Sequence, residues 1–221
     1  MNDTSCVLAG LIRLLTPPVL IVLWHKKTGA RFYPALIAVI VCFPAFIIGA
    51  MIRSGFQIES FVGRFLANGL LYGILEEGTK FLTMKYLLGD YDSRKDAVTY
   101  GLAHGYQENF SAGLSCFGLI GTGRAASDIF GVNLWTALAG AAFSVSLTVL
   151  IFYGIQTDKS MLMLPIAILV HAFGNAFMGI FRFDTAVVIL GDGLLTAGVC
   201  YAAYRCWKSL WDPYDDEYKT G

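Results

Sequence analysis

Long apolar runs recur along almost the whole chain, and they restrict the folds that it can adopt. They lie at about residues 6–24, 32–52, 61–88, 96–121, 132–156, 160–181 and 184–207. A run of about 20 apolar residues is long enough to cross the hydrocarbon core of a bilayer as a helix. The sequence therefore predicts an all-α, polytopic integral membrane protein with about seven transmembrane helices.

The composition agrees with a membrane protein built as one unit. Hydrophobic residues make up 56% of the chain and charged residues only 14%, whereas soluble domains carry about a quarter charged residues. The segments between the apolar runs are short, so we expect a single transmembrane helical domain over residues 1–221. Its motif-bearing core spans about residues 60–181, and residues 209–221 form a polar tail. With a formal net charge of zero and no basic stripe, we expect no nucleic-acid partner.

Lysine and arginine residues near the ends of the apolar runs predict the orientation. With the N-terminus outside, eight of them fall in the cytoplasmic loops and at the base of the tail, and four fall at the outer edges. Because cytoplasmic loops of membrane proteins are enriched in these residues, we predict an N-out, C-in topology.

Polar side chains interrupt three of the apolar runs as pairs. Each pair has i,i+4 spacing, which places both members on one helix face. The pairs are Glu76 with Lys80, next to Glu77, then His104 with Glu108, and His171 with Asn175. Ionisable groups are costly inside a bilayer and therefore mark candidate functional sites.

The three pairs share one depth in the predicted membrane. Counted from the cytoplasmic ends of their segments, Glu76, His104 and His171 lie about 8–12 residues in, which is roughly 12–18 Å at the helical rise. Gly101 and Gly105 flank His104 at GxxxG spacing, which lets membrane helices approach closely. We therefore predict that these polar side chains meet in one site inside the helical bundle.

The groups available at this depth suit hydrolysis by activated water. The chain has no Ser-His-Asp arrangement, no GxSxG elbow and no HExxH helix. A buried carboxylate and an imidazole can activate water, and a second imidazole with an amide can stabilise the oxyanion, with no cofactor required. The same groups, Glu76, His104, Glu108 and His171, could instead hold zinc with one position open for water. From the residues alone, the choice between Glu76 and Glu77 as the base stays open, as does the presence of a metal.

Three motifs in this order resemble those of a known group of membrane peptidases. They are EExxK (Glu76, Glu77, Lys80), YxxxH running into HGxxEN (Tyr100, His104, Glu108, Asn109) and HxxxN (His171, Asn175). The pattern, within about residues 60–180, resembles the CAAX-protease and bacteriocin-processing superfamily, and within it most closely the PrsW and YhfC type families. This resemblance implies a glutamic-type intramembrane endopeptidase that cleaves a membrane protein or peptide in or near the lipid bilayer.

The resemblance also implies roles for individual residues. Glu76 and His104 would activate water, and His171 and Asn175 would stabilise the oxyanion. The other motif residues complete the predicted site: Glu77 and Glu108 as catalytic residues, and Lys80, Tyr100 and Asn109 as supporting ones. CAAX-type enzymes carry an arginine one position after Lys80, where this chain has Phe81, so specificity for prenylated proteins is not predicted.

Two other functions compete with proteolysis. Distant relatives of the superfamily include the seven-helix scaffold subunit of gamma-secretase, so the resemblance also admits a non-catalytic membrane scaffold. A scaffold, however, needs no base that activates water. A transporter would also place polar residues near the bilayer midplane, but the chain shows neither repeated halves nor a matching pair of helices broken by Gly or Pro.

Two further charges and the position of the site lead to two more predictions. Arg13 and Asp192 lie at matching depth in the first and last segments, which predicts an ion pair between them. Glu76, His104 and His171 lie nearer the predicted cytoplasmic ends of their segments, which predicts a site that opens to the cytoplasm or the inner leaflet.

Overall fold

A computed structural model describes residues 2–54, 60–90, 93–124, 129–181 and 185–210; most of these residues lie in helices, and no β-strand occurs among them. The elements are α1 (Asn2–Thr28), α2 (Tyr33–Ser54), α3 (Phe61–Arg64), η1 (Phe65–Leu70), α4 (Leu71–Leu82), η2 (Thr83–Leu87), α5 (Arg94–His104), α6 (Tyr106–Phe117), η3 (Ile129–Leu134), α7 (Trp135–Gln156), α8 (Ser160–Phe181) and α9 (Thr185–Ser209). The three η elements are π-helical, and η1 and η2 flank α4 directly.

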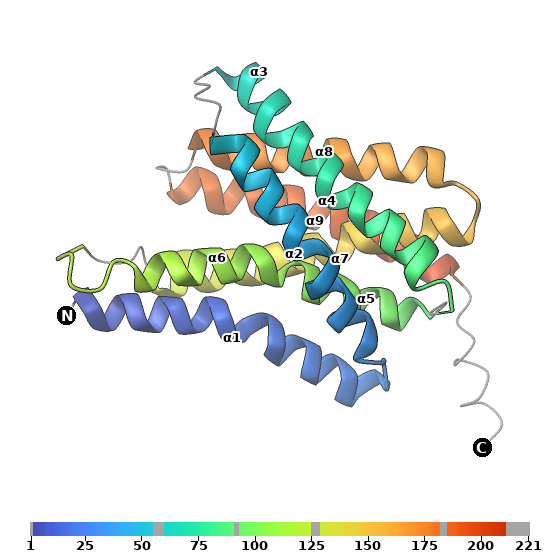
Figure 1. The fold of residues 1–221 in the computed structure, drawn as a ribbon, viewed down its shortest axis with the longest axis horizontal. Helices are drawn as coiled ribbons and strands as arrows, with labels where there is room; N and C mark the ends of the chain where they lie inside the picture. Colours follow the sequence, from blue (N-terminus) through green and yellow to red (C-terminus); the bar gives the residue numbers. More distant parts are fainter. Residues whose placement is uncertain (1, 55–59, 91–92, 125–128, 182–184, 211–221) are drawn as a thin grey trace.

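Each predicted apolar run contains helical elements, and within the described residues four helices are long and apolar enough to cross a bilayer. These four lie at Asp3–Thr28, Val132–Gln156, Ser160–Phe177 and Ala186–Ser209, and a shorter apolar helix lies at Tyr33–Gly49. The protein is therefore an integral, multi-pass helical membrane protein. Successive runs point in opposite directions, so α1 begins and α9 ends at opposite ends of the bundle (Figure 1). Seven spans and the N-out orientation remain predictions.

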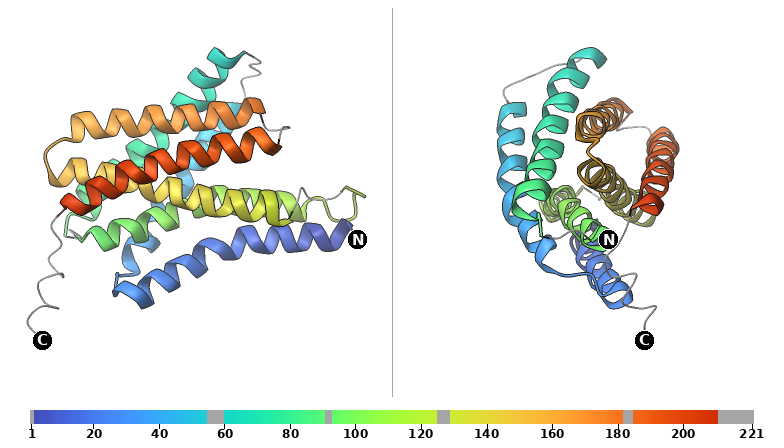
Figure 2. Two further views of the ribbon diagram at one scale, coloured as in Figure 1. Left: turned by 180° about the vertical axis from the view of Figure 1, so that it is seen from behind. Right: turned by 90° about the vertical axis from the view of Figure 1, so that its right-hand side faces the viewer.

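Helix α7 is the centre of the bundle. Buried positions make up 61% of its apolar window, against 22% in each of the other three long apolar helices. It packs against α5, α8 and α9, as the end-on view of Figure 2 shows. Helices α2 and α4 lie side by side and cross these helices obliquely (Figures 1 and 2). Polar groups carried by α7 and its neighbours therefore face one another within the protein.

Helix α1 bends in its middle because it contains two adjacent prolines, Pro17 and Pro18 (Figure 1). Proline lacks an N–H, and its ring collides with the carbonyl group four residues earlier, which kinks a helix. For Pro17 that carbonyl belongs to Arg13. The one arginine in the apolar stretch of α1 thus lies directly before the bend.

Glycines allow two close helix contacts that set the positions of both membrane histidines. A Cβ atom on Gly101 would lie 2.7 Å from Val145 Cα, so α5 approaches the backbone of α7 directly. A Cβ atom on Gly73 would lie 2.7 Å from the carbonyl oxygen of Ile168, so α4 approaches α8 equally closely. The predicted close packing at the GxxxG sequence is confirmed. The two contacts bring His104 towards α7 and bring His171 towards α4.

Candidate active site

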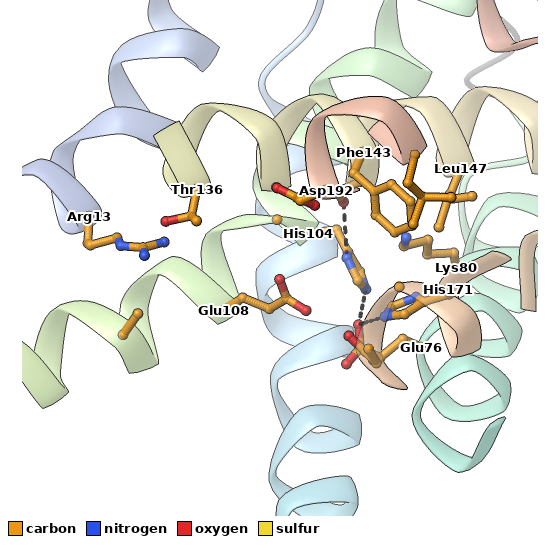
Figure 3. A pocket seen from close by; sticks show the side chains of 17 residues that line it. Arg13, Glu76, Lys80, His104, Glu108, Thr136, Phe143, Leu147, His171 and Asp192 are labelled. Atoms are coloured by element: carbon orange, nitrogen blue, oxygen red, sulfur yellow. Dashed lines mark hydrogen bonds and ion pairs between the residues drawn. The ribbon is translucent and has the colours of Figure 1, made fainter. Parts of the chain in front are cut away.

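Polar residues from each of the three motifs line one cavity of about 280 Å³ inside the bundle (Figure 3). Seven helices contribute to its wall: α1, α4, α5, α6, α7, α8 and α9. Its polar and charged lining residues are Arg13, Glu76, Lys80, His104, Glu108, Thr136, Ser144, His171, Asn175 and Asp192. Apolar residues, among them Phe143, Leu147 and Leu195, complete the wall.

Glu76 lies between the two histidines. Its Oε2 atom is 3.8 Å from His104 Nε2 and 3.8 Å from His171 Nε2. All three side chains are buried, with residue exposures of 3–4%. The predicted convergence of both histidines on one glutamate is therefore confirmed.

Glu77 faces away from the cavity and holds the residues behind it. Its Oε1 atom lies 2.6 Å from His171 Nδ1 and accepts a hydrogen bond of 2.7 Å from Lys80 Nζ. Glu77 and Lys80 are completely buried, and Glu77 does not line the cavity. Lys80 thus neutralises Glu77, and the glutamate exposed to the cavity is Glu76. A carboxylate on Nδ1 fixes the imidazole so that His171 presents the lone pair of Nε2 to the cavity.

His104 is fixed in the same way by a hydroxyl group. The Ser144 hydroxyl donates its proton to the carbonyl oxygen of Gly101 at 2.9 Å, so its oxygen is free to accept from His104 Nδ1 at 3.3 Å. His104 Nε2 then carries a lone pair, and this buried atom has no hydrogen-bond partner within the described residues. Ser144 was not predicted from the sequence. Serine and threonine hydroxyls in apolar helices commonly bond the carbonyl four residues earlier, as Ser146 and Thr148 do here.

Glu108 and Asn175 complete the polar wall around Glu76. Glu108 is exposed on α6, and its side chain extends towards Glu76 in Figure 3. Single ligand atoms of Glu76, Glu108 and His171 all lie within 4.8 Å of one another. Asn175 lies one helical turn beyond His171 and lines the same cavity.

The two other motif residues lie outside the cavity wall. The Tyr100 hydroxyl lies 3.0 Å from Cys42 Sγ, so this side chain joins α5 to α2. Asn109 donates through Nδ2 to the carbonyl oxygen of Gly105 at 3.1 Å and accepts from Arg13 Nη1 at 3.3 Å. Their predicted supporting roles therefore rest on helix packing and on hydrogen bonds behind the cavity wall.

The predicted ion pair between Arg13 and Asp192 is wrong. Both residues line the cavity, but Arg13 Nε donates to Asn133 Oδ1 at 3.2 Å, and Nη1 donates to Asn109. Helix α1 packs against α6, α5 and η3, which turns Arg13 towards asparagines instead of towards α9.

The cavity extends towards the end of the bundle where α1 begins. Its buried limit is formed by Lys80 and Leu147, which are inaccessible, and its other end is lined by Arg13, Thr136 and Asp192. Thr136 is the second residue of α7. If the N-terminus lies outside, this end of the cavity faces the outer side of the membrane. The lining residues therefore give no support to the predicted opening towards the cytoplasm. The side of the membrane itself stays a prediction.

The donor set fits a divalent cation. The Nε2 atoms of both imidazoles each lie 3.8 Å from Glu76 Oε2, which is too far for hydrogen bonds. Ligands of a tetrahedral zinc ion at ordinary bond lengths lie about 3.4 Å apart. Single ligand atoms of Glu76, Glu108 and His171 lie within 4.8 Å of one another and His104 is not part of that group, so a cation held by both histidines and Glu76 would require the two imidazoles to move closer together. The charged groups that line or support the cavity are four carboxylates (Glu76, Glu77, Glu108, Asp192) and two cations (Arg13, Lys80). If both histidines are neutral, these groups carry a net charge of −2, which a divalent cation would balance.

A comparison with protein families finds a match for the part of the chain that carries the first two motifs. Residues 12–116 match the family described as YhfC intramembrane metalloprotease. The matched region includes Glu76, His104 and Glu108 and ends before His171. The predicted resemblance to the YhfC type is thereby confirmed. Among curated proteins and among solved structures, none matches the chain.

Proposed function

We propose that this protein, whose residues 12–116 fall in the YhfC family, is an intramembrane metalloprotease. It would hydrolyse a peptide bond of a membrane protein or peptide at the cavity centre. One observation carries the proposal: two buried imidazole Nε2 atoms face the same carboxylate oxygen of Glu76. Both Nδ1 atoms are occupied, one by Glu77 and one by Ser144.

Glu76 Oε2, His104 Nε2 and His171 Nε2 would hold the cation. A divalent cation held there would activate water and polarise the carbonyl group of the substrate. Glu77 and Ser144 keep the two imidazoles in the orientation that binding requires, since outer partners of metal-binding histidines fix ring and tautomer. In this arrangement His171 cannot donate to an oxyanion through Nε2, so that role falls to Asn175.

Glu108 is the best-placed proton carrier. Its carboxylate lies within 4.8 Å of the ligand atoms of Glu76 and His171, yet it remains exposed to the cavity. It would accept a proton from the attacking water and deliver it to the leaving amine. The Asn175 side-chain amide would donate to the carbonyl oxygen as negative charge develops there.

The activity is testable without a known substrate. Cells that produce the wild-type protein or its Glu76→Gln variant would be compared by sequencing the N-termini of their membrane-protein fragments. The control is Asp90→Asn, the same acid-to-amide change at an exposed position outside the cavity. We expect new N-termini within or beside transmembrane segments for wild type and Asp90→Asn, and none for Glu76→Gln. Identical fragment sets from all three proteins would contradict the proposal.

Chelation separates the metal-dependent mechanism from the glutamic one. Purified protein treated with 1,10-phenanthroline should lose its bound metal, measured by elemental analysis, and its cleavage activity with it. Activity should return when zinc is added back. Full activity in metal-free protein would show that Glu76 acts as the base without a cation.

A further inference from the structure

The end of the cavity that lies towards the start of α1 contains a fixed cation that has no role in the proposed hydrolysis. Arg13 enters the wall from α1, and Figure 3 shows its guanidinium pointing towards the side of the cavity where Thr136 and Glu108 lie. Its Nε and Nη1 atoms donate to Asn133 and Asn109 at 3.2 and 3.3 Å. Nη2 has no hydrogen-bond partner within the described part of the chain.

The two asparagines hold this guanidinium in place. Asn109 is itself bonded to the carbonyl oxygen of Gly105 at 3.1 Å, and both asparagines are buried, with exposures of 2% and 3%. No carboxylate of the described residues lies within ion-pair distance of Arg13. Amide oxygens satisfy two of the guanidinium N–H groups without neutralising the charge, so the remaining donors can bind an additional oxygen acceptor.

A peptide that is cut inside a membrane presents such acceptors. The scissile segment has to leave its helix, and its carbonyl groups then have no partner in hydrocarbon, which is costly. A cavity that accepts this segment must provide donors. Arg13 offers the strongest donor in the wall away from Glu76, His104 and His171, since hydrogen bonds from charged groups exceed those from neutral ones.

We infer that Arg13 anchors the substrate: its guanidinium donates to an oxygen acceptor of the unwound peptide segment in the cavity. The acceptor is a main-chain carbonyl or a carboxylate of that segment. The inference rests on the proposed function for the nature of the ligand. It makes Arg13 a positioning residue whose loss weakens peptide binding and leaves the cation site intact.

The test measures binding without turnover. Full-length Glu76→Gln protein in detergent would be titrated into two fluorescent transmembrane peptides of about 25 residues. Both carry a central Gly-Gly pair in an alanine- and leucine-rich helix, and one has a single Asp beside the pair. The same titrations are made with Arg13→Gln and with Arg205→Gln added. Arg205 is the matched control, because it is exposed near the end of α9 and bonds the Tyr201 hydroxyl outside the cavity.

We expect Arg13→Gln to raise the dissociation constant about 10- to 100-fold, the effect of losing one charge-assisted hydrogen bond. Arg205→Gln should leave it unchanged. A loss for both peptides identifies a main-chain carbonyl as the acceptor, and a loss confined to the Asp peptide identifies a carboxylate. Unchanged affinity for both peptides overturns the inference, and so does failure of the Glu76→Gln protein to bind either peptide.

Two further measurements keep the result interpretable. Thermal unfolding and the zinc content of Arg13→Gln in the otherwise wild-type protein should match those of wild type, since Arg13 contacts no proposed ligand of the cation. If Arg13→Gln does not fold, Arg13→Lys replaces it; its single ammonium cannot reach both asparagines and the peptide, so it should also weaken binding. Because no step depends on cleavage, a protein without protease activity can still confirm the anchor, and an active protease can still refute it.

Discussion

Glu77 and His171 are 94 residues apart in the sequence, yet Glu77 Oε1 lies 2.6 Å from His171 Nδ1 in the centre of the bundle. The same oxygen accepts from Lys80, so one carboxylate joins a buried cation to an imidazole. This contact explains why two adjacent glutamates occur in an apolar helix. Glu76 faces the cavity, and Glu77 holds the ring that completes the cavity wall.

Glu77→Gln should affect both stability and metal binding. The change leaves Lys80 buried beside a neutral partner, which typically costs about 3–5 kcal/mol of unfolding free energy. It also weakens the bond that orients His171, for which a 10- to 100-fold loss of metal affinity is expected, that is, about 1.4–2.7 kcal/mol. Thermal unfolding in detergent and competitive zinc titration measure the two effects.

The double variant Glu77→Gln/Lys80→Met separates these effects. Removing both charges should restore most of the stability, because a buried ion pair replaced by uncharged groups is often neutral in energy. Metal affinity should remain low, since His171 still lacks its carboxylate. Recovery of both properties in the double variant would show that Glu77 serves only to neutralise Lys80.

Ser144→Ala should weaken the centre through His104. The alanine removes the acceptor for Nδ1, so the ring can rotate or change tautomer, and metal affinity should fall about 10- to 100-fold. Ser146→Ala is the matched control, because Ser146 lies two residues away on α7 and bonds Ala142 and Cys200 outside the cavity. Equal zinc affinities for the two variants would mean that Ser144 does not orient His104.

Glu76→Gln and Glu108→Gln should fail in different ways. Glu76→Gln removes a proposed ligand, so bound zinc and cleavage should disappear together. Glu108→Gln removes the proposed proton carrier, so zinc should remain while the rate of cleavage falls about 10²–10⁴-fold. Elemental analysis and a cleavage assay on the same samples decide between them. Loss of zinc from Glu108→Gln would instead make Glu108 a ligand.

Residue depth could be predicted from the sequence because a helix advances by a fixed rise. That rise placed Glu76, His104 and His171 in one layer, and the structure confirms that they meet. Rotation of each helix about its axis could not be predicted in the same way. Adjacent residues such as Glu76 and Glu77 point about 100° apart, and the contact of Gly73 with α8 decides which of them faces the cavity.

The same limit explains why Asp192 was wrongly predicted as the partner of Arg13. Equal depth matched it to Asp192, but depth does not say which helices are neighbours. Helix α1 packs against α6, and α9 packs against α7. The asparagines that bind Arg13 come from α6 and η3. Nothing in the spacing of these asparagines along the sequence indicated that they would face α1.

Gly101→Ala should disturb the site by displacing a helix. The added Cβ atom would lie 2.7 Å from Val145 Cα, a backbone contact that side-chain movement cannot relieve. Overpacking of this kind typically costs about 1–3 kcal/mol, and the shift of α5 away from α7 should also lengthen the bond between His104 and Ser144.

Gly198→Ala on α9 is the control, because its Cβ would meet nothing within 4 Å. Thermal unfolding in detergent and zinc affinity should fall for Gly101→Ala and stay at wild-type values for Gly198→Ala. Equal values for the two variants would show that close contact at Gly101 is not required to hold His104 in the site.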